Sequence, residues 1–282
     1  MALSGFIMKT TFIKKILKGL GIIAGLLLIG YVLLILFFMI AQDFYIFEPE
    51  KKYHAPKEIG FESVFREIKI KTIDDLVLDA WLYEGDVQKP AILYLHGNNR
   101  ELSYFAPRLV PYFEEKYTVL MVEYRGYGRN AGRPSEEGLI TDALAGYKYL
   151  KERGYKVVVH GFSLGTGVAL GLADKVQVDG VILEAPFYSM RTLVQETIPI
   201  LPTGVMLRNR FPSNKRIRRL HKPLLVLHGT NDKTIPYQHS QKLVKDANET
   251  NKVAVFIENG THLNLPERGE FDTIIPWLKM RF

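Results

Sequence analysis

The chain contains no cysteine among its 282 residues. This absence excludes disulfide bonds, a cysteine nucleophile and thiolate-bound metal sites. It does not identify the compartment, because a chain without thiols has nothing to oxidise. The sequence also lacks an H-E-x-x-H motif and any clustered spacing of histidine and acidic residues. We therefore expect no metal site and no cofactor.

Low-complexity tracts, Pro/Gly/Ser-rich linkers and internal repeats are absent as well. With 47% hydrophobic and 24% charged residues, the chain has the composition of a folded protein. Its length allows one domain with a large buried core, plus an appendage.

The formal net charge is +7, and the basic residues gather before an N-terminal apolar segment and within residues 208–222. A basic balance can favour nucleic acid or an anionic membrane surface. No recognised DNA- or RNA-binding pattern accompanies either group, so we expect no nucleic-acid partner.

Residues 19–42 contain no charged side chain. As a helix this segment is about 36 Å long, enough for a hydrocarbon core of about 30 Å. A cleaved signal peptide is the alternative, but its apolar region is usually shorter, and Met39-Ile40-Ala41 is a poor cleavage site. The pattern favours an uncleaved transmembrane anchor, with membrane lipid as its partner.

The lysines that flank this segment indicate its orientation. Four precede it and three follow it: Lys9, Lys14, Lys15, Lys18, and Lys51, Lys52, Lys57. The positive-inside rule then places the N-terminus in the cytoplasm and the rest of the chain on the outer, extracytoplasmic side. Met8 is a second plausible start, and translation from Met8 would make the first seven residues an extension of the reading frame.

Short apolar runs recur after the anchor. Residues 64–70 and 76–83, separated by Asp74-Asp75, predict an antiparallel strand pair. Six further runs predict strands of a mostly parallel sheet, namely 91–95, 118–122, 156–159, 181–183, 224–227 and 253–257. Helical stretches, notably 135–153 and 164–174, alternate with them. This order predicts an α/β fold with helices on both faces and an active site at the carboxyl ends of the strands.

One of these strands runs into the pentapeptide Gly161-Phe162-Ser163-Leu164-Gly165, which a helix follows. A sharp strand-to-helix turn exposes the hydroxyl of a serine held in a strained conformation. Gly161 and Gly165 allow strand and helix to approach closely. The backbone N–H of Leu164, at the helix start, points where an oxyanion would form. Ser163 is therefore the predicted nucleophile.

His96-Gly97-Asn98-Asn99 follows the strand at 91–95 directly. The loop after this strand supplies the second oxyanion donor in folds with a serine turn of this kind, and the backbone N–H of Asn98 is the candidate. His96 precedes the serine in the chain, so it is expected to shape the loop rather than act as a base.

An acid and a histidine follow the serine in the expected order. Asp232 ends the turn after the strand at 224–227, and His262 lies just past the strand at 253–257. A serine hydroxyl needs a base to take its proton, and an acid to orient that base. Glu184, after the strand at 181–183, is the rival acid. Histidines 160, 221, 228 and 239 are interpreted as structural, and His54 lies outside the strand series.

With these residues in view, the chain resembles the α/β-hydrolase superfamily, and more narrowly the bud-emergence-type single-pass membrane serine hydrolases. The matching stretches are LYLHGNNR (93–100), VEYRGYGRNAGRPSEEGL (122–139), HGFSLGTGVAL (160–170), LEAPFYSM (183–190), LLVLHGTNDKTIP (224–236) and ENGTHLNLP (258–266). The resemblance implies the α/β-hydrolase fold and a Ser163, Asp232, His262 triad. It leaves the substrate open, since such relatives have been assigned esterase, thioesterase, lipase and peptidase-like activities. Relatives tethered by palmitoylated cysteines differ from this chain, whose tether must be the helix.

The predicted organisation is a basic flank (1–18), a transmembrane anchor (19–42), a juxtamembrane segment (43–59) and an α/β-hydrolase domain (60–282). A short lid of one or two helices is expected at about 188–222. Its apolar wall would consist of Leu193, Ile198, Ile200, Leu201, Val205, Met206 and Leu207. The basic residues after it are either a solvated face or a rim that attracts anionic groups.

The sequence favours a membrane-anchored hydrolase that cleaves carboxylic esters or thioesters of acyl or lipid-like substrates through an acyl-enzyme on Ser163. A peptidase acting on short peptides and a catalytically silent scaffold are the alternatives. The sequence does not indicate whether the protein is a monomer or an oligomer.

Overall fold

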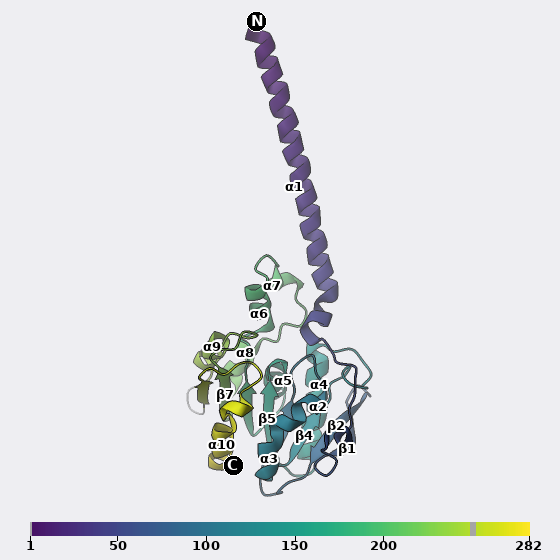
Figure 1. The fold of residues 1–282 in the computed structure, drawn as a ribbon, viewed down its shortest axis with the longest axis vertical. Helices are drawn as coiled ribbons and strands as arrows, with labels where there is room; N and C mark the ends of the chain where they lie inside the picture. Colours follow the sequence, from purple (N-terminus) through teal and green to yellow (C-terminus); the bar gives the residue numbers. More distant parts are fainter. Residues whose placement is uncertain (1, 249–251) are drawn as a thin grey trace.

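A computed structural model describes residues 2–248 and 252–282, with side chains from Phe12 onward in the first helix. Met1, the first residue of the predicted basic flank, lies outside the described residues. The first helix, α1, runs over Ala2–Phe47 and projects away from the rest of the molecule (Figure 1). Within the described residues, Phe12–Phe47 is the one helix long and apolar enough to cross a membrane, with a mean hydropathy of 2.9 over an 18-residue stretch.

Helix α1 does not end where the uncharged segment ends. It continues through Asp43, in the expected juxtamembrane segment, and its last turn enters the domain. Ile46 is 8% exposed and Phe47 is fully buried, and both belong to the main hydrophobic core. The tether and the domain are therefore joined by packed side chains.

Eight strands of the described chain form one sheet in the order β1-β2-β4-β3-β5-β6-β7-β8. The strands β1 and β2 pair antiparallel, as do β2 and β4, and all later neighbours pair parallel. Their bounds are Arg66–Lys71 (β1), Val77–Tyr83 (β2), Ala91–Leu95 (β3), Val119–Val122 (β4), Val157–Phe162 (β5), Gly180–Glu184 (β6), Leu224–Gly229 (β7) and Lys252–Ile257 (β8). The predicted antiparallel pair and the mostly parallel sheet are confirmed.

Helices cover both faces of the sheet, and successive residues of each buried strand serve opposite faces. In β3, Leu93 belongs to the core under α4 (Glu136–Lys151) and α5 (Leu164–Ala173). Its neighbour Tyr94 belongs to the second core, under α2 (Leu102–Phe105), α3 (Val110–Glu114) and α10 (Phe271–Arg281). This is why the strands read as continuous apolar runs. The expected α/β-hydrolase fold is confirmed.

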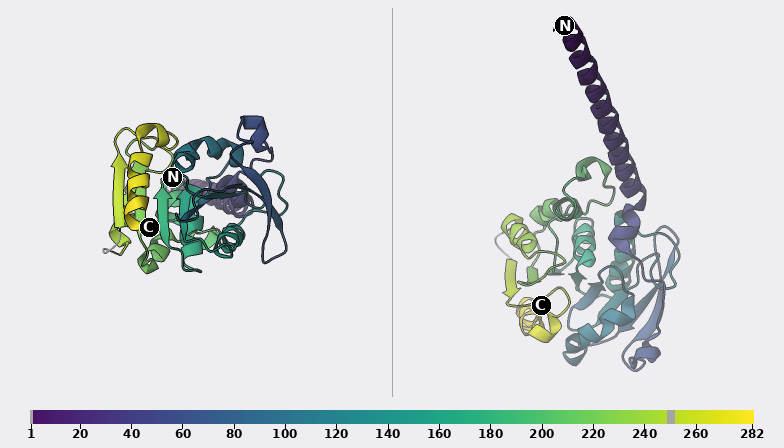
Figure 2. Two further views of the ribbon diagram at one scale, coloured as in Figure 1. Left: turned by 90° about the horizontal axis from the view of Figure 1, so that it is seen from below. Right: turned by 45° about the horizontal axis from the view of Figure 1, so that its top comes forward.

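The segment between β6 and β7 contains three short α-helices and a 3₁₀ turn, more than the one or two helices expected. They are α6 (Met190–Thr197), α7 (Thr203–Met206), α8 (Ser213–Arg216) and η3 (Ile217–Arg219). Two views agree that α6 and α7 lie beside the domain end of α1 (Figures 1 and 2). We call residues 188–222 the lid. Elsewhere, the remaining elements are η1 (Pro56–Ile59), η2 (Ala106–Leu109), α9 (Gln238–Asp246) and η5 (Pro266–Arg268).

Gly165 sits where α5 crosses the end of β3. A Cβ atom added to Gly165 would lie 1.9 Å from the carbonyl oxygen of Leu95, a backbone atom that cannot rotate away. We expect Gly165→Ala to lower the free energy of unfolding by about 3 kcal/mol or more, because the strand and the helix would have to separate. Chemical denaturation of the detergent-solubilised chain measures this loss. Gly25→Ala is the control, since nothing lies within 4 Å of a Cβ there, and equal stability of the two variants would contradict the close packing.

Candidate active site

Ser163 occupies the turn between β5 and α5. Its φ of 52° and ψ of −116° lie in a region that side chains other than glycine rarely adopt. Glycines make the turn possible: a Cβ at Gly161 would lie 2.4 Å from the carbonyl oxygen of Gly165. The strained backbone of Ser163 directs its hydroxyl away from the sheet, at the edge where the carboxyl ends of the strands lie.

The structure brings the three predicted side chains together. The Nε2 atom of His262 lies 2.9 Å from the Oγ atom of Ser163. Its Nδ1 atom lies 2.7 Å from the Oδ2 atom of Asp232. The imidazole therefore connects hydroxyl and carboxylate in one hydrogen-bonded chain. In this geometry Nδ1 carries the proton toward the carboxylate and Nε2 is free to accept the proton of the serine.

Asp232 is held at both carboxylate oxygens. Its Oδ1 atom accepts hydrogen bonds from the backbone N–H groups of Thr234 and Ile235, at 2.8 and 2.9 Å. Burial alone would raise the pKa of Asp232, but hydrogen bonds from His228 and His262 outweigh it and hold this pKa well below its ordinary value. The carboxylate thus stays ionised at neutral pH in a fixed orientation.

His228 contributes more than the structural role expected for it. Its Nε2 atom faces two acceptors, the carbonyl oxygen of Ile235 at 2.8 Å and the Oδ2 atom of Asp232 at 3.1 Å. Both are acceptors, so Nε2 must carry the proton, and Nδ1 accepts from the hydroxyl of Ser240. This buried histidine therefore helps to hold the carboxylate of Asp232 in place. The i, i+4 spacing of His228 and Asp232 was the available signal in the sequence.

The rival acid, Glu184, faces away from His262. Its side chain pairs with Arg108 and lies 3.5 Å from His160. Burial opposes its ionisation, but the charge of Arg108 and the hydrogen bond from His160 hold the pKa of Glu184 below its ordinary value. Its backbone carbonyl instead accepts from the N–H of Ser163 at 2.9 Å, which fixes the serine turn to β6.

The two expected oxyanion donors flank Ser163. Leu164 opens α5 and is 3% exposed, and Asn98 borders the same cavities as Ser163. Within the described residues, neither backbone N–H donates a hydrogen bond. Unpaired N–H groups beside a nucleophile are suited to stabilise a developing negative charge. The side chain of Asn98 also donates to the carbonyl oxygen of Ile46, at the end of α1, at 3.4 Å.

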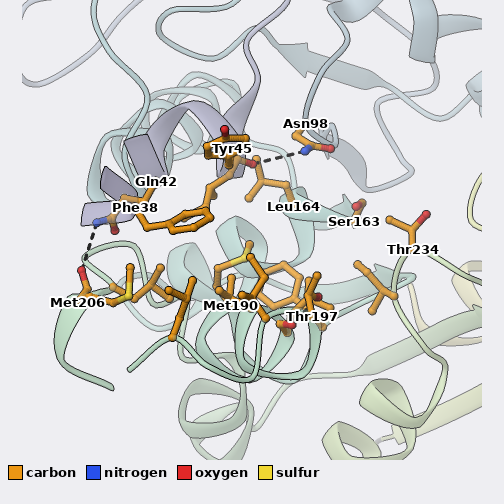
Figure 3. A pocket seen from close by; sticks show the side chains of 18 residues that line it. Phe38, Gln42, Tyr45, Asn98, Ser163, Leu164, Met190, Thr197, Met206 and Thr234 are labelled. Carbon is orange, nitrogen blue, oxygen red and sulfur yellow. Dashed lines mark hydrogen bonds between the residues drawn. The ribbon is translucent and has the colours of Figure 1, made fainter. Parts of the chain in front are cut away.

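Ser163 lies at the border of two cavities that differ in polarity. The first has a volume of about 430 Å³ and is lined mostly by apolar side chains, the majority of them from α1 and the lid. It extends from Ser163 and Thr234 at one end to Phe38 and Met206 at the other (Figure 3). We call it the apolar cavity.

The second cavity, of about 440 Å³, lies on the His262 side of Ser163. Two exposed cations, Arg100 and Lys233, stand on its rim with Asn231 and Thr261. We call it the polar cavity. It is the more polar of the two cavities, although Phe105, Phe162 and Leu263 also line it. The serine hydroxyl therefore has a more apolar space on one side and a more polar space on the other.

The expected apolar wall of the lid is right in part. Leu193, Ile198, Leu201, Met206 and Leu207 line the apolar cavity. Ile200 and Val205 do not, and they are 62% and 85% exposed. The prolines at 199 and 202 interrupt the helix, so no single periodicity governs which side chains turn inward.

The basic residues of the lid are largely neutralised within the chain. Arg208, Arg216, Arg218 and Arg219 form ion pairs with Asp43, Glu136, Asp246 and Asp174 in turn. These four arginines are held in intramolecular ion pairs, and neither of the two expectations for the basic group, a solvated face or a rim that attracts anionic groups, included such pairs. Arg100 and Lys233 instead line the polar cavity together with Ser163, and sequence reasoning missed them because each stands alone in a loop.

Sequence reasoning also missed the contribution of α1 to the site. Phe38, Gln42, Tyr45 and Ile46 all line the apolar cavity. Gln42 and Tyr31 carry the polar side-chain groups in the second half of the uncharged segment, and these were the signals of a contact with the domain. The amide of Gln42 donates to the carbonyl oxygen of Met206 at 3.2 Å and accepts from the N–H of Arg208 at 2.7 Å.

Comparison with known proteins agrees with the fold and the order of the motifs. The model of the alpha/beta hydrolase family matches residues 92–213. The uncharacterized protein Rv2307c of Mycobacterium tuberculosis is 34% identical over 196 residues, which span 67% of this chain and 70% of the relative. The chain belongs to the α/β-hydrolase family. It is therefore a hydrolase of the α/β type.

Two further relatives place it within this family. Protein bem46 of Schizosaccharomyces pombe is 33% identical over 198 residues, 64% of either chain, in agreement with the bud-emergence-type resemblance. Among solved structures, the esterase Pf2001 of Pyrococcus furiosus superposes with a TM-score of 0.67 at 20% identity, over 83% of this chain and 98% of the esterase. At this identity the likeness concerns the fold.

Proposed function

We propose that this protein is a membrane-anchored serine hydrolase that cleaves carboxylic esters or thioesters through an acyl-enzyme on Ser163. One observation carries the proposal. The Oγ atom of Ser163, 2.9 Å from the Nε2 atom of His262, lies where the apolar and the polar cavity meet. An acyl chain fits the first cavity and a polar alcohol or thiol fits the second. The esterase activity of the structural relative from Pyrococcus furiosus is consistent with this choice.

The reaction follows from the groups in place. As Oγ of Ser163 attacks the carbonyl carbon, Nε2 of His262 takes the hydroxyl proton, and the N–H groups of Leu164 and Asn98 stabilise the oxyanion. The bond to the leaving alcohol or thiol then breaks, and His262 returns the proton to it. Water attacks the acyl-enzyme with His262 again as base, which releases the carboxylic acid and restores Ser163. Asp232 stabilises the imidazolium in both halves.

Anchoring is the second part of the proposal. Residues 19–42 would cross the bilayer, with the N-terminus in the cytoplasm and the domain on the outer side, as the flanking lysines favour. Membrane lipid is then the partner of α1. An anchored enzyme with an apolar cavity beside its tether is suited to acyl substrates close to the bilayer.

A substrate panel tests the activity. Full-length protein in detergent is incubated with nitrophenyl esters, acyl thioesters and aminoacyl anilides, in parallel with Ser163→Ala. We expect hydrolysis of esters or thioesters that the variant lacks. Turnover of anilides alone would establish a peptidase instead. A folded protein that binds an active-site fluorophosphonate but turns over no panel member would restrict the substrate to classes outside the proposal.

A further inference from the structure

The anchor helix is part of the wall of the apolar cavity. Phe38 and Gln42, from the uncharged segment of α1, face Met206 of the lid across its far end, away from Ser163 (Figure 3). The hydrogen bonds of Gln42 to Met206 and Arg208 tie this stretch of α1 to the lid. Asp43 continues the contact through Arg208 and Asn209, at 2.8 and 2.6 Å. A tether alone would need none of these contacts.

A hydrogen bond at the tip of the lid, which we define as residues 197–207, indicates how deep this tip lies relative to the membrane. The hydroxyl of Tyr31 donates to the carbonyl oxygen of Ile200 at 2.8 Å. A hydrocarbon core of about 30 Å requires about 20 helical residues, and these must come from the uncharged residues 19–42. Every such window contains Tyr31, which lies about 10–16 Å along the helix from the domain-side boundary. The lid tip, paired with Tyr31, therefore lies below that boundary.

The composition of the lid tip suits this depth. Residues 197–207 carry no charge, and Ile200 and Val205 expose most of their side chains. Exposed apolar side chains next to a spanning helix remove area from water when they enter lipid.

Several backbone N–H groups of the lid tip are also hydrogen-bonded to carbonyl oxygens of the lid itself. The N–H groups of Val205, Met206 and Leu207 donate to carbonyl oxygens of the same segment, and Pro199 and Pro202 have no N–H to satisfy. Irregular backbone at membrane depth is tolerated where it is packed against protein, and the contacts of this segment with α1 provide such packing. The hydrogen bond from Tyr31 also satisfies the carbonyl oxygen of Ile200.

We propose that the lid tip inserts into the bilayer beside α1, and that the apolar cavity receives the acyl chain of a membrane lipid, with Phe38 limiting the length of that chain. This inference rests on the proposed acyl hydrolase function and names its substrate class, a membrane-resident lipid ester or thioester. The acyl chain of the lipid then passes from the hydrocarbon core of the bilayer into the apolar cavity without crossing water. The polar head group of the lipid then faces the polar cavity, with Arg100 and Lys233 on its rim.

A chain-length series tests the role of Phe38. Wild type, Phe38→Ala, Phe38→Trp and Phe44→Ala are reconstituted in phosphatidylcholine vesicles, and kcat/KM is measured for nitrophenyl esters from acetate to palmitate. Phe44 lies on the same helix, is 67% exposed and does not line the cavity. We expect the optimum to move to longer chains in Phe38→Ala and to shorter ones in Phe38→Trp, with changes of about tenfold in the long-to-short ratio. Phe44→Ala should keep the wild-type optimum, and one optimum shared by all four proteins would overturn the role of Phe38.

The absence of cysteine allows a second measurement that does not depend on activity. Val205→Cys is labelled with bimane, and its fluorescence is measured in vesicles that contain doxyl-labelled lipid. Val87→Cys is the matched control, since Val87 is 70% exposed on the domain. We expect strong quenching at position 205 and none at position 87. Equal quenching would overturn the insertion of the lid, whereas ester hydrolysis that survives in Ser163→Ala would overturn the proposed function instead.

Discussion

Ser163→Ala is expected to lower kcat for ester hydrolysis by about 10⁴-fold or more, because no other group in the site can form the acyl-enzyme. His262 and the oxyanion donors remain in this variant, so the residual rate reflects their contribution alone. Stopped-flow or steady-state kinetics on a nitrophenyl ester measure the loss. The free energy of unfolding should change little, because among the described residues the hydroxyl of Ser163 makes one hydrogen bond, to His262.

A second serine provides the control for this substitution. Ser135 caps α4, where its hydroxyl accepts a hydrogen bond from the N–H of Gly138 at 3.1 Å. Ser135→Ala should lower the free energy of unfolding by about 1 kcal/mol and leave kcat unchanged. If Ser163→Ala retained the kcat of Ser135→Ala, Ser163 would not be the nucleophile.

Asp232→Asn is expected to lower kcat by about 10⁴-fold while the ester still binds. An asparagine can offer its N–H to Nδ1 of His262, and this favours the tautomer whose Nε2 carries the proton. His262 then presents a donor to Ser163 and cannot accept its proton. The kcat and KM of the variant, measured separately, should show a loss confined to kcat.

Substitution of Glu184, the rival acid, tests whether Asp232 or Glu184 orients His262. Glu184→Gln removes a buried charge paired with Arg108 and should reduce stability, but Glu184 makes no contact with His262. We expect its kcat to exceed that of Asp232→Asn by at least about 100-fold, given the loss expected for the triad acid. A reversed order of the two variants would assign the acid role to Glu184.

The sequence was most informative where chemistry and backbone geometry coincide. The apolar strand before Ser163 and the glycines around it predict the turn. Asp232 and His262 lie in the loops that directly follow β7 and β8. Parallel strands deliver their carboxyl ends to one edge, so the meeting of Asp232 and His262 with Ser163 follows from strand order.

The parts that sequence reasoning missed depend on contacts between distant segments. Gln42 and Met206 are far apart in the chain, and a long apolar helix with one glutamine carries no pattern that indicates which residue the glutamine contacts. In the lid, Ile200 and Leu201 are adjacent in the sequence, but the side chain of Ile200 is exposed and that of Leu201 is buried. Their orientation depends on the packing against α1, because the prolines around them remove helical periodicity.

The most direct measurement maps the covalent site. The full-length protein is treated with a fluorophosphonate probe, digested, and analysed by mass spectrometry, with Ser163→Ala, Ser135→Ala and His262→Ala in parallel. The account predicts an adduct on Ser163 in the wild type and in Ser135→Ala, slow labelling in His262→Ala, and none in Ser163→Ala. An adduct on any other serine, or equal labelling of Ser163→Ala, would contradict it.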